Sequence, residues 1–343
     1  IAYSKRRKYL LGRETHGLMN YPFRVSAMDY LRGGDAAAFK EAMETIRENY
    51  PRPAFYSCMN MLGTHDNPRI LTLLGTFPKE APHTRTERAH YRMTPEEMVD
   101  SARAAWEAGY KTIVLQSGED PFFTSALLGE IVREIKRTGL AMTVSCGEMP
   151  REDYAHLRAC GADRYLLKHE TADPVLYDSL HPCGALSERV ACLKTLKALG
   201  FETGSGFMIG LPGQTNETVA RDLLLLREIG CDMAGIGPFI PHPDTPLRDL
   251  PHGSTELTKR AVALARLLLP KANLPATTSL GVIDGKEKND VFSCGANVIM
   301  RKVTPDAYKQ KYEIYPAALG HTDIKAERAE LENMIRGLGK IPQ

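Results

Sequence analysis

A regular alternation of strand and helix patterns runs through the chain after Thr94 and restricts it to a few folds. Each predicted strand is a short β-branched or apolar run, and a helix pattern separates it from the next. Strands arranged in this way pair in parallel through right-handed crossovers. The predicted strands are 112–115, 141–145, 164–167, 202–209, 233–236, 276–280 and 296–300.

These seven units predict an α/β fold, a (β/α) barrel of the TIM type, in which a closed ring needs eight strands. A doubly wound sheet is the competing architecture, but the Gly-x-Gly-x-x-Gly phosphate turn of that fold is absent from the sequence. Glycine and polar residues cluster after the strands, at the end where barrels hold their sites. We therefore predict the barrel.

The octapeptide at residues 91–98, Tyr-Arg-Met-Thr-Pro-Glu-Glu-Met, separates this pattern from a different kind of sequence. We interpret it as a junction between two domains, 1–90 and 91–343. The first domain has a helix pattern at 36–49 and a strand pattern at 54–62. Because a seven-stranded barrel leaves two exposed edges, we predict that the strand at 54–62 fills the vacant eighth slot.

Composition excludes several classes of partner. The 343 residues carry 44 basic and 42 acidic side chains, interspersed along the chain, which predicts no nucleic-acid and no membrane partner. No apolar run approaches the ~18 residues of a membrane span. The seven cysteines show no Cys-x-x-Cys spacing and predict reduced, cytoplasmic thiols. The chain begins with Ile1, which we interpret as the start of a fragment.

Carboxylates follow three successive predicted strands, at Glu119, Glu148 and Glu170. The carboxyl ends of barrel strands meet at one mouth, so these side chains are candidates to hold an amine or ribose hydroxyls. The alternative is that each one caps the next helix. Arg189, near the start of a later helix, is either a bidentate partner for a ligand carboxylate or a solvated helix charge.

Ordered segments between Tyr91 and Pro316 carry a family resemblance. Among them are Thr112-Ile-Val-Leu-Gln-Ser-Gly-Glu-Asp-Pro, Gly161-Ala-Asp-Arg-Tyr-Leu-Leu-Lys-His-Glu-Thr, Met208-Ile-Gly-Leu-Pro-Gly-Gln-Thr and Cys294-Gly-Ala-Asn-Val-Ile-Met. Through them the chain resembles the HydE-type radical S-adenosylmethionine (SAM) enzymes of FeFe-hydrogenase maturation. The resemblance implies reductive cleavage of SAM to a 5′-deoxyadenosyl radical, which attacks a small-molecule or organometallic iron substrate. It also implies hydrogenase-maturation proteins as partners.

The same resemblance implies roles for particular residues. The methionine moiety of SAM would lie against Ser117, Gly118 and Glu119. Its ribose would be held by Glu170 and its carboxylate by Arg189. The deeper substrate cavity would be lined by Arg164, Thr277, Thr278 and Tyr315, although paired threonines also occur in strands for packing alone.

One element of that family is missing from the sequence. Such enzymes hold a 4Fe-4S cluster with the thiolates of Cys-x-x-x-Cys-x-x-Cys, and the free iron binds SAM. That motif is absent here, and Cys58 is the only cysteine before Cys146. We therefore predict no metal ligands and no cluster-dependent activity.

Residues 1 to about 97 resemble a second family, the α-amylase superfamily of glycoside hydrolases, in its neopullulanase-like branch. The segments are Lys5-Arg-Arg-Lys-Tyr-Leu-Leu-Gly, Met19-Asn-Tyr-Pro-Phe-Arg and Met59-Asn-Met-Leu-Gly-Thr-His-Asp-Asn-Pro-Arg-Ile. The resemblance implies that Asp66 stabilises a glycosidic transition state, whereas Gly-Thr-His-Asp-Asn-Pro alone would indicate a turn. Hydrolysis also needs a nucleophile and a general acid, which that family carries upstream of this segment.

Three hypotheses follow from the sequence. The first is a HydE-type radical SAM enzyme whose cluster segment has been replaced in a chimera. The second is an α-amylase-type hydrolase fragment that carries the C-terminal part as a passenger. The third is a barrel that binds SAM without turning it over. We predict the first as the family and the third as the behaviour.

Overall fold

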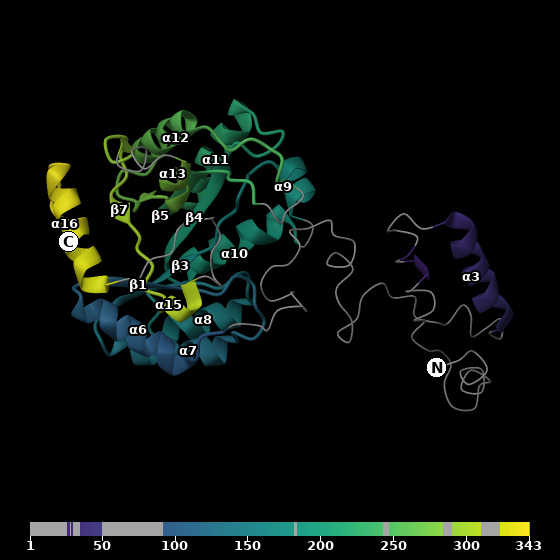
Figure 1. Ribbon diagram of the computed structural model, residues 1–343, viewed down its shortest axis with the longest axis horizontal. Coiled ribbons are helices and arrows are strands. Elements are labelled where there is room, and N and C mark those ends of the chain that lie inside the picture. Colours follow the sequence, from purple (N-terminus) through teal and green to yellow (C-terminus); the bar gives the residue numbers. More distant parts are fainter. Residues whose placement is uncertain are drawn as a thin grey trace. The chain divides into compact units, whose positions relative to one another are not determined.

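The computed structural model describes residues 26–27, 29, 35–49, 92–181, 184–242, 247–283, 290–309 and 323–342. The chain divides into two compact units, Ile1–His90 with Pro243–Arg248 and Tyr91–His242 with Asp249–Gln343. In the first unit, the predicted helix is confirmed as α3 (Ala36–Asn49) (Figure 1). The strand predicted at 54–62 and the candidate Asp66 lie outside the described residues.

A parallel sheet of five strands, in the order β1-β2-β3-β4-β5, forms the centre of the second unit. Its strands are β1 (Thr112–Gln116), β2 (Ala141–Ser145), β3 (Arg164–Leu166), β4 (Glu202–Ile209) and β5 (Met233–Pro238). The helices between them are α7 (Ser125–Lys136), α8 (Arg151–Ala159), α9 (Pro174–Leu180), α10 (Leu186–Ala198) and α11 (Asn216–Ile229). Neighbouring strands in space are consecutive in the chain, as a (β/α) barrel requires.

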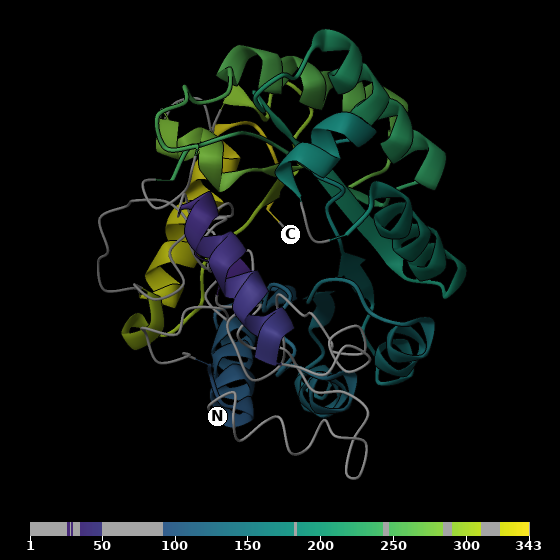
Figure 2. The same cartoon turned by 90° about the vertical axis from the view of Figure 1, so that its right-hand side faces the viewer.

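The sheet is curled, and helices follow the outside of the curve (Figure 2). Side chains alternate between the two faces of a strand, and Tyr165, Phe207 and Ile236 point to the helical side, where they are almost completely buried. Tyr165 contacts the ring of Tyr154 on α8 edge-on, with the ring centroids 5.0 Å apart. The apolar core therefore lies between the sheet and its helices.

The opposite face of the sheet is built from small residues where β4 and β5 pair. Gly206 lies directly opposite Gly235 in the register of the two strands. A Cβ atom on Gly206 would lie 2.1 Å from the carbonyl oxygen of Gly235. Only glycine permits this approach of the two strands.

The last part of the barrel differs from its prediction. Helix α12 (Thr255–Leu268) leads to β6 (Pro275–Ala276), which pairs with β7 (Val298–Ile299) in a separate two-stranded sheet. The strand predicted at 276–280 is wrong beyond Ala276, because residues 278–283 form helix α13 (Thr278–Ile283). Helix α9 was not predicted.

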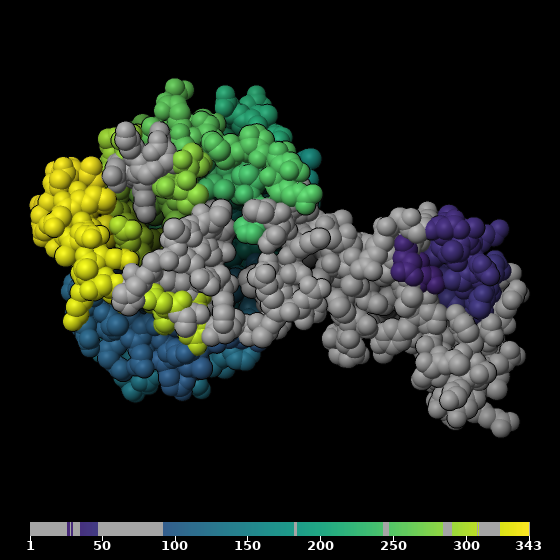
Figure 3. Space-filling view, viewed as in Figure 1, coloured from purple at the N-terminus to yellow at the C-terminus, as the bar shows by residue number. Residues whose placement is uncertain are grey.

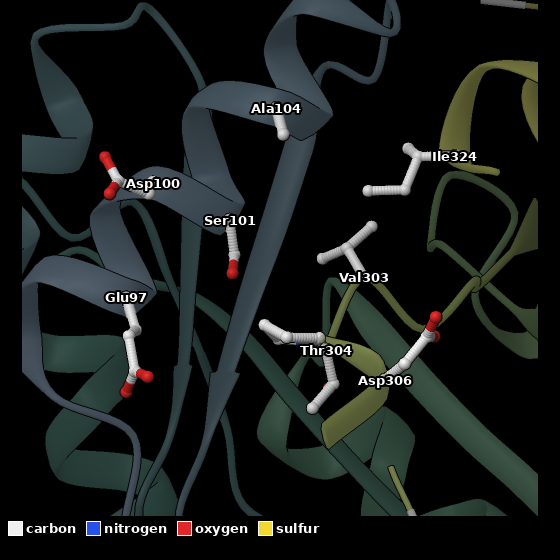
Figure 4. Close-up of a pocket in the computed structure, with 9 residues that line it drawn as sticks. Glu97, Asp100, Ser101, Ala104, Val303, Thr304, Asp306 and Ile324 are labelled. Carbon is white, nitrogen blue, oxygen red and sulfur yellow. The ribbon is translucent and has the colours of Figure 1, made fainter. Parts of the chain in front are cut away.

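Helix α6 (Pro95–Glu107) opens the second unit. Its N-terminus is a capping box in which Thr94 accepts from Glu97 N and Glu97 accepts from Thr94 N. The C-terminal part of the chain, with α15 (Asp306–Lys309) and α16 (Ile324–Gly337), lies beside α6 (Figure 3). Between them is a hollow of 390 Å³, which α6 lines with Glu97, Asp100, Ser101 and Ala104 (Figure 4).

In the described ranges, no helix is long and apolar enough to cross a bilayer.

Candidate functional site

The loop after β1 presents an open stretch of backbone. Gly118 has a φ of 64°, and a Cβ there would meet no atom within 4 Å. Behind it, Arg92 donates to both oxygens of Asp120, at 2.8 and 3.1 Å. Arg92 comes from the 91–98 junction, so the start of the second unit fixes the position of residues 117–120.

The side chain of Glu119, after β1, packs against Gly147, which follows the neighbouring strand β2. A Cβ on Gly147, which has a φ of 82°, would be 2.4 Å from the Cγ of Glu119. The glycine therefore makes room for this side chain. Glu119 Oε1 accepts from Arg189 Nη2 at 3.1 Å, which joins the end of β1 to helix α10.

Arg189 is the centre of the charged cluster, and its side chain is 7% exposed. Its Nε lies 2.8 Å from Glu148 Oε1 and donates toward the hydroxyl of Tyr177 at 3.3 Å. Burial works against the charge of Arg189, but Tyr177, Glu148 and Glu119 outweigh it and raise the pKa of the guanidinium. With two carboxylates and one guanidinium, the cluster is suited to a cationic ligand.

Glu148 is held in a turn beneath this cluster. The hydroxyls of Tyr154 and Tyr165 donate to Gly147 O at 3.3 and 2.9 Å, and Met149 N donates to Tyr154 Oη at 2.9 Å. Partial burial raises the pKa of Glu148, while Arg189 lowers it and Glu119 raises it further. Glu148 is therefore easier to protonate than an ordinary glutamate.

Glu170 follows β3 at the same edge of the sheet. Its φ is 60°, and among the described residues it is the only non-glycine residue with a positive φ. Its Oε2 is buried and accepts no hydrogen bond from any described group. A buried carboxylate oxygen of this kind lacks a donor that a ligand hydroxyl would supply.

Of the residues assigned to a deeper cavity, Thr277 lies at the carboxyl end of β6 beside Gly237 of β5, whereas Arg164 lies at the other end of its strand. Arg164 begins β3, at the opposite end of the strand, and donates to Glu202 Oε2 at 2.5 Å and Thr112 Oγ1 at 3.1 Å. Thr277 lies between β6 and α13, within 3.2 Å of Ser279 Oγ. Thr278 begins α13 and is exposed. Tyr315 lies outside the described residues.

The described residues hold no set of three neighbouring thiolates of the kind that binds an iron–sulfur cluster. Among the described residues, no group of three or more His, Cys, Asp or Glu side chains could hold a metal ion. The cysteines in these ranges are Cys146, Cys160, Cys192, Cys231 and Cys294, and no two of the chain's seven have the spacing of the cluster motif. The strand-end residues, by contrast, offer two carboxylates, a guanidinium and an open glycine backbone to a charged organic ligand.

Comparison with known families bears on the family resemblance and on the fold. The family model of the radical SAM superfamily matches residues 76–226. Over these residues the chain is similar to that superfamily. The match begins upstream of Tyr91, so the likeness to this superfamily reaches into the segment that we assigned to the first domain. The resemblance of that segment to the α-amylases remains a prediction.

The relatives refine this result. The chain is 54% identical over 229 residues to the [FeFe] hydrogenase maturase subunit HydE of Thermotoga maritima, an alignment that covers 67% of this chain and 66%, slightly under two thirds, of that protein. It is 28% identical over 264 residues to the 3-methylornithine synthase of Methanosarcina acetivorans, with 76% and 74% covered. The crystal structure of methylornithine synthase (PylB) superposes with a TM-score of 0.63 and 23% identity over 75% of this chain and 76% of PylB. The fold is thus a partial (β/α) barrel, as predicted.

Some of the site residues gave no signal in the sequence. Tyr177 and His181 contact Arg189 from α9 and its end, a helix that the strand–helix rhythm did not reveal. Gly147 was visible as a glycine after a strand, but its role in seating Glu119 depends on the neighbouring strand.

Proposed function

We propose that the barrel unit binds SAM in the manner of a HydE-type enzyme, at the carboxyl ends of β1 to β4. The observation that carries this proposal is Glu170 Oε2, a buried acceptor that finds no donor among the residues the structure describes. It follows β3, whereas Glu119 and Glu148 follow β1 and β2 of the same parallel sheet. These three carboxylates therefore share one edge.

The parts of SAM match the chemistry of this edge. The negative cluster of Glu119, Glu148 and Arg189 suits the ammonium and sulfonium groups of the methionine moiety. Arg189 uses Nε and Nη2 within the described residues, which leaves Nη1 to a ligand carboxylate. The backbone of Ser117 and Gly118 is open to the methionine chain, and Glu170 accepts from the ribose hydroxyls.

The likeness to HydE supports a substrate class. We propose a small-molecule or organometallic substrate and a role in maturing an FeFe hydrogenase, because the chain is 54% identical to HydE of Thermotoga maritima over 229 residues. Thr277, Thr278 and Tyr315 are proposed to line the deeper cavity for that substrate, whereas Arg164, at the amino end of β3, is not.

We propose further that the chain does not cleave SAM reductively, because the sequence upstream of Tyr91 has a single cysteine, Cys58, and no Cys-x-x-x-Cys-x-x-Cys motif. After anaerobic reconstitution with iron and sulfide, we expect no brown chromophore and no stoichiometric iron or acid-labile sulfide. Iron and sulfide analysis together with visible absorbance measures this. A chain that retains four irons and four sulfides after desalting would contradict the proposal.

Isothermal calorimetry with SAM tests the binding. In Glu170→Gln one carboxylate oxygen becomes an amide nitrogen that cannot accept from a hydroxyl, so we expect the affinity to fall about 10-fold. Glu202→Gln is the matched control, because Glu202 lies at the amino end of β4 and pairs with Arg164. Equal affinity of Glu170→Gln and the unaltered chain, or no heat from the unaltered chain, would refute the proposal.

A further inference from the structure

Glu170 adopts a backbone conformation that a glutamate does not adopt by itself. With a φ of 60° it is in the left-handed region, which side chains other than glycine and asparagine disfavour. Its backbone is locked to β4, since Glu170 N donates to Gly206 O at 3.0 Å and Met208 N donates to Glu170 O at 3.2 Å. Strain of this kind persists only where the surroundings over-determine it.

The residue before Glu170 belongs to a buried polar group on the helical side of the sheet. His169 is 0% exposed, and its Nδ1 lies 2.9 Å from the hydroxyl of Ser205 on β4. Ser205 Oγ also accepts from His169 N at 3.2 Å and donates to Leu167 O at 2.9 Å. Because the single hydroxyl hydrogen goes to Leu167 O, His169 Nδ1 must be the donor to Ser205.

Helix α11 completes this group with Asp222, which is also 0% exposed. Asp222 Oδ1 lies 3.5 Å from His169 Nε2 and accepts a short hydrogen bond from Ala172 N. Nε2 itself makes no hydrogen bond with any described group. Burial raises the pKa of Asp222, and His169 opposes this.

The contacts of this group fall on both sides of Glu170 along the chain. Ser205 holds Leu167 O and His169 N before it, and Asp222 holds Ala172 N after it. None of the three side chains is on the open face of the sheet, so none can contact a ligand there. Their buried polar atoms need an explanation other than binding.

We infer that Ser205, His169 and Asp222 form a positioning triad that fixes the left-handed turn of Glu170 and so aims its carboxylate at the ribose hydroxyls of SAM. The triad acts through Glu170 and rests on the proposed function. Through Asp222, the triad makes the affinity for SAM depend on α11, a helix that supplies no side chain to the cluster of Glu119, Glu148 and Arg189.

A double-mutant cycle on SAM affinity, measured by calorimetry on the full chain, tests the triad. We expect Asp222→Asn to weaken SAM about 10-fold when Glu170 is present, and to have no further effect in Glu170→Gln, because residues that act through one another are not additive. Amide hydrogen exchange of residues 169–172 should speed up in Asp222→Asn while exchange in β2 is unchanged. Ser205→Ala is the milder variant should Asp222→Asn fold poorly.

Asp232→Asn is the matched control. Asp232 Oδ2 accepts from Thr203 N at 2.8 Å, so it anchors the amino end of β4 as Asp222 anchors the turn at 170. We expect it to leave SAM affinity unchanged. Equal weakening by Asp222→Asn with and without the carboxylate of Glu170 would overturn the triad, as would a normal affinity in Asp222→Asn and Ser205→Ala. If Glu170→Gln itself binds normally, the proposed function fails, and the triad fails with it.

Discussion

Replacement of Arg189 by methionine is expected to weaken SAM binding at least ~100-fold and to lower the free energy of unfolding by about 3 kcal/mol. Methionine keeps much of the length and the apolar contacts of the arginine but removes the charge between Glu119 and Glu148, two carboxylates within 3.1 Å of the guanidinium. They would repel each other in a partly desolvated site. Calorimetry measures the affinity, and denaturant unfolding measures the stability.

The stability loss in Arg189→Met is expected to depend on pH. Glu148 already has a raised pKa in the folded chain, so the folded state binds more protons than the unfolded state and stability falls as pH rises. Removal of Arg189 takes away the cation that lowers this pKa. The pKa of Glu148 in the folded variant should therefore rise further, and the pH interval over which stability falls should become wider. The deficit of the variant should therefore be smaller near pH 4 than near pH 7.

Arg221→Met is the matched control for this prediction. Arg221 lies on α11, is 57% exposed and pairs with Asp173 at 3.0 Å. An exposed pair of this kind contributes at most ~1 kcal/mol, and SAM affinity should not change. If Arg189→Met behaves like Arg221→Met in stability, affinity and pH dependence, the charged cluster has no role in binding.

The sequence predicted this cluster only in part. Glu119, Glu148 and Glu170 could be assigned to one edge because parallel strands end on the same side. The pairing of Arg189 with two of them could not be predicted, because it depends on how far α10 rotates toward the sheet. Asp222 was the least predictable, since a carboxylate in a helix pattern normally indicates a solvated face.

The fold shows the same division between local pattern and tertiary context. The five strands of the main sheet were predicted within a few residues because each is a short apolar run between helices. The segment Thr277-Thr-Ser-Leu has the β-branched composition of a strand, yet Thr278 begins helix α13. Contacts of α13 with β5 outweigh that intrinsic preference.

Substitution of Gly206 by alanine is expected to lower the free energy of unfolding by about 3 kcal/mol. The new Cβ would lie 2.1 Å from Gly235 O and 2.9 Å from Gly235 C, both backbone atoms of a paired strand, so β4 and β5 would have to separate. Gly206 O also accepts from Glu170 N, so SAM affinity should fall with stability. Chemical denaturation and calorimetry on the same preparation measure both effects.

Gly235→Ala is the matched control, because the two glycines face each other in register on the same side of the sheet. A Cβ on Gly235 would meet Lys168 Cε at 3.4 Å, and a flexible side-chain tip can move aside. We expect a loss below ~1 kcal/mol, offset by the lower entropy that alanine gives the unfolded chain. Equal losses at the two positions would mean that glycine is needed here for chain flexibility. A loss confined to Gly206→Ala would instead show that close approach of β4 to β5 holds Glu170 at the ligand edge.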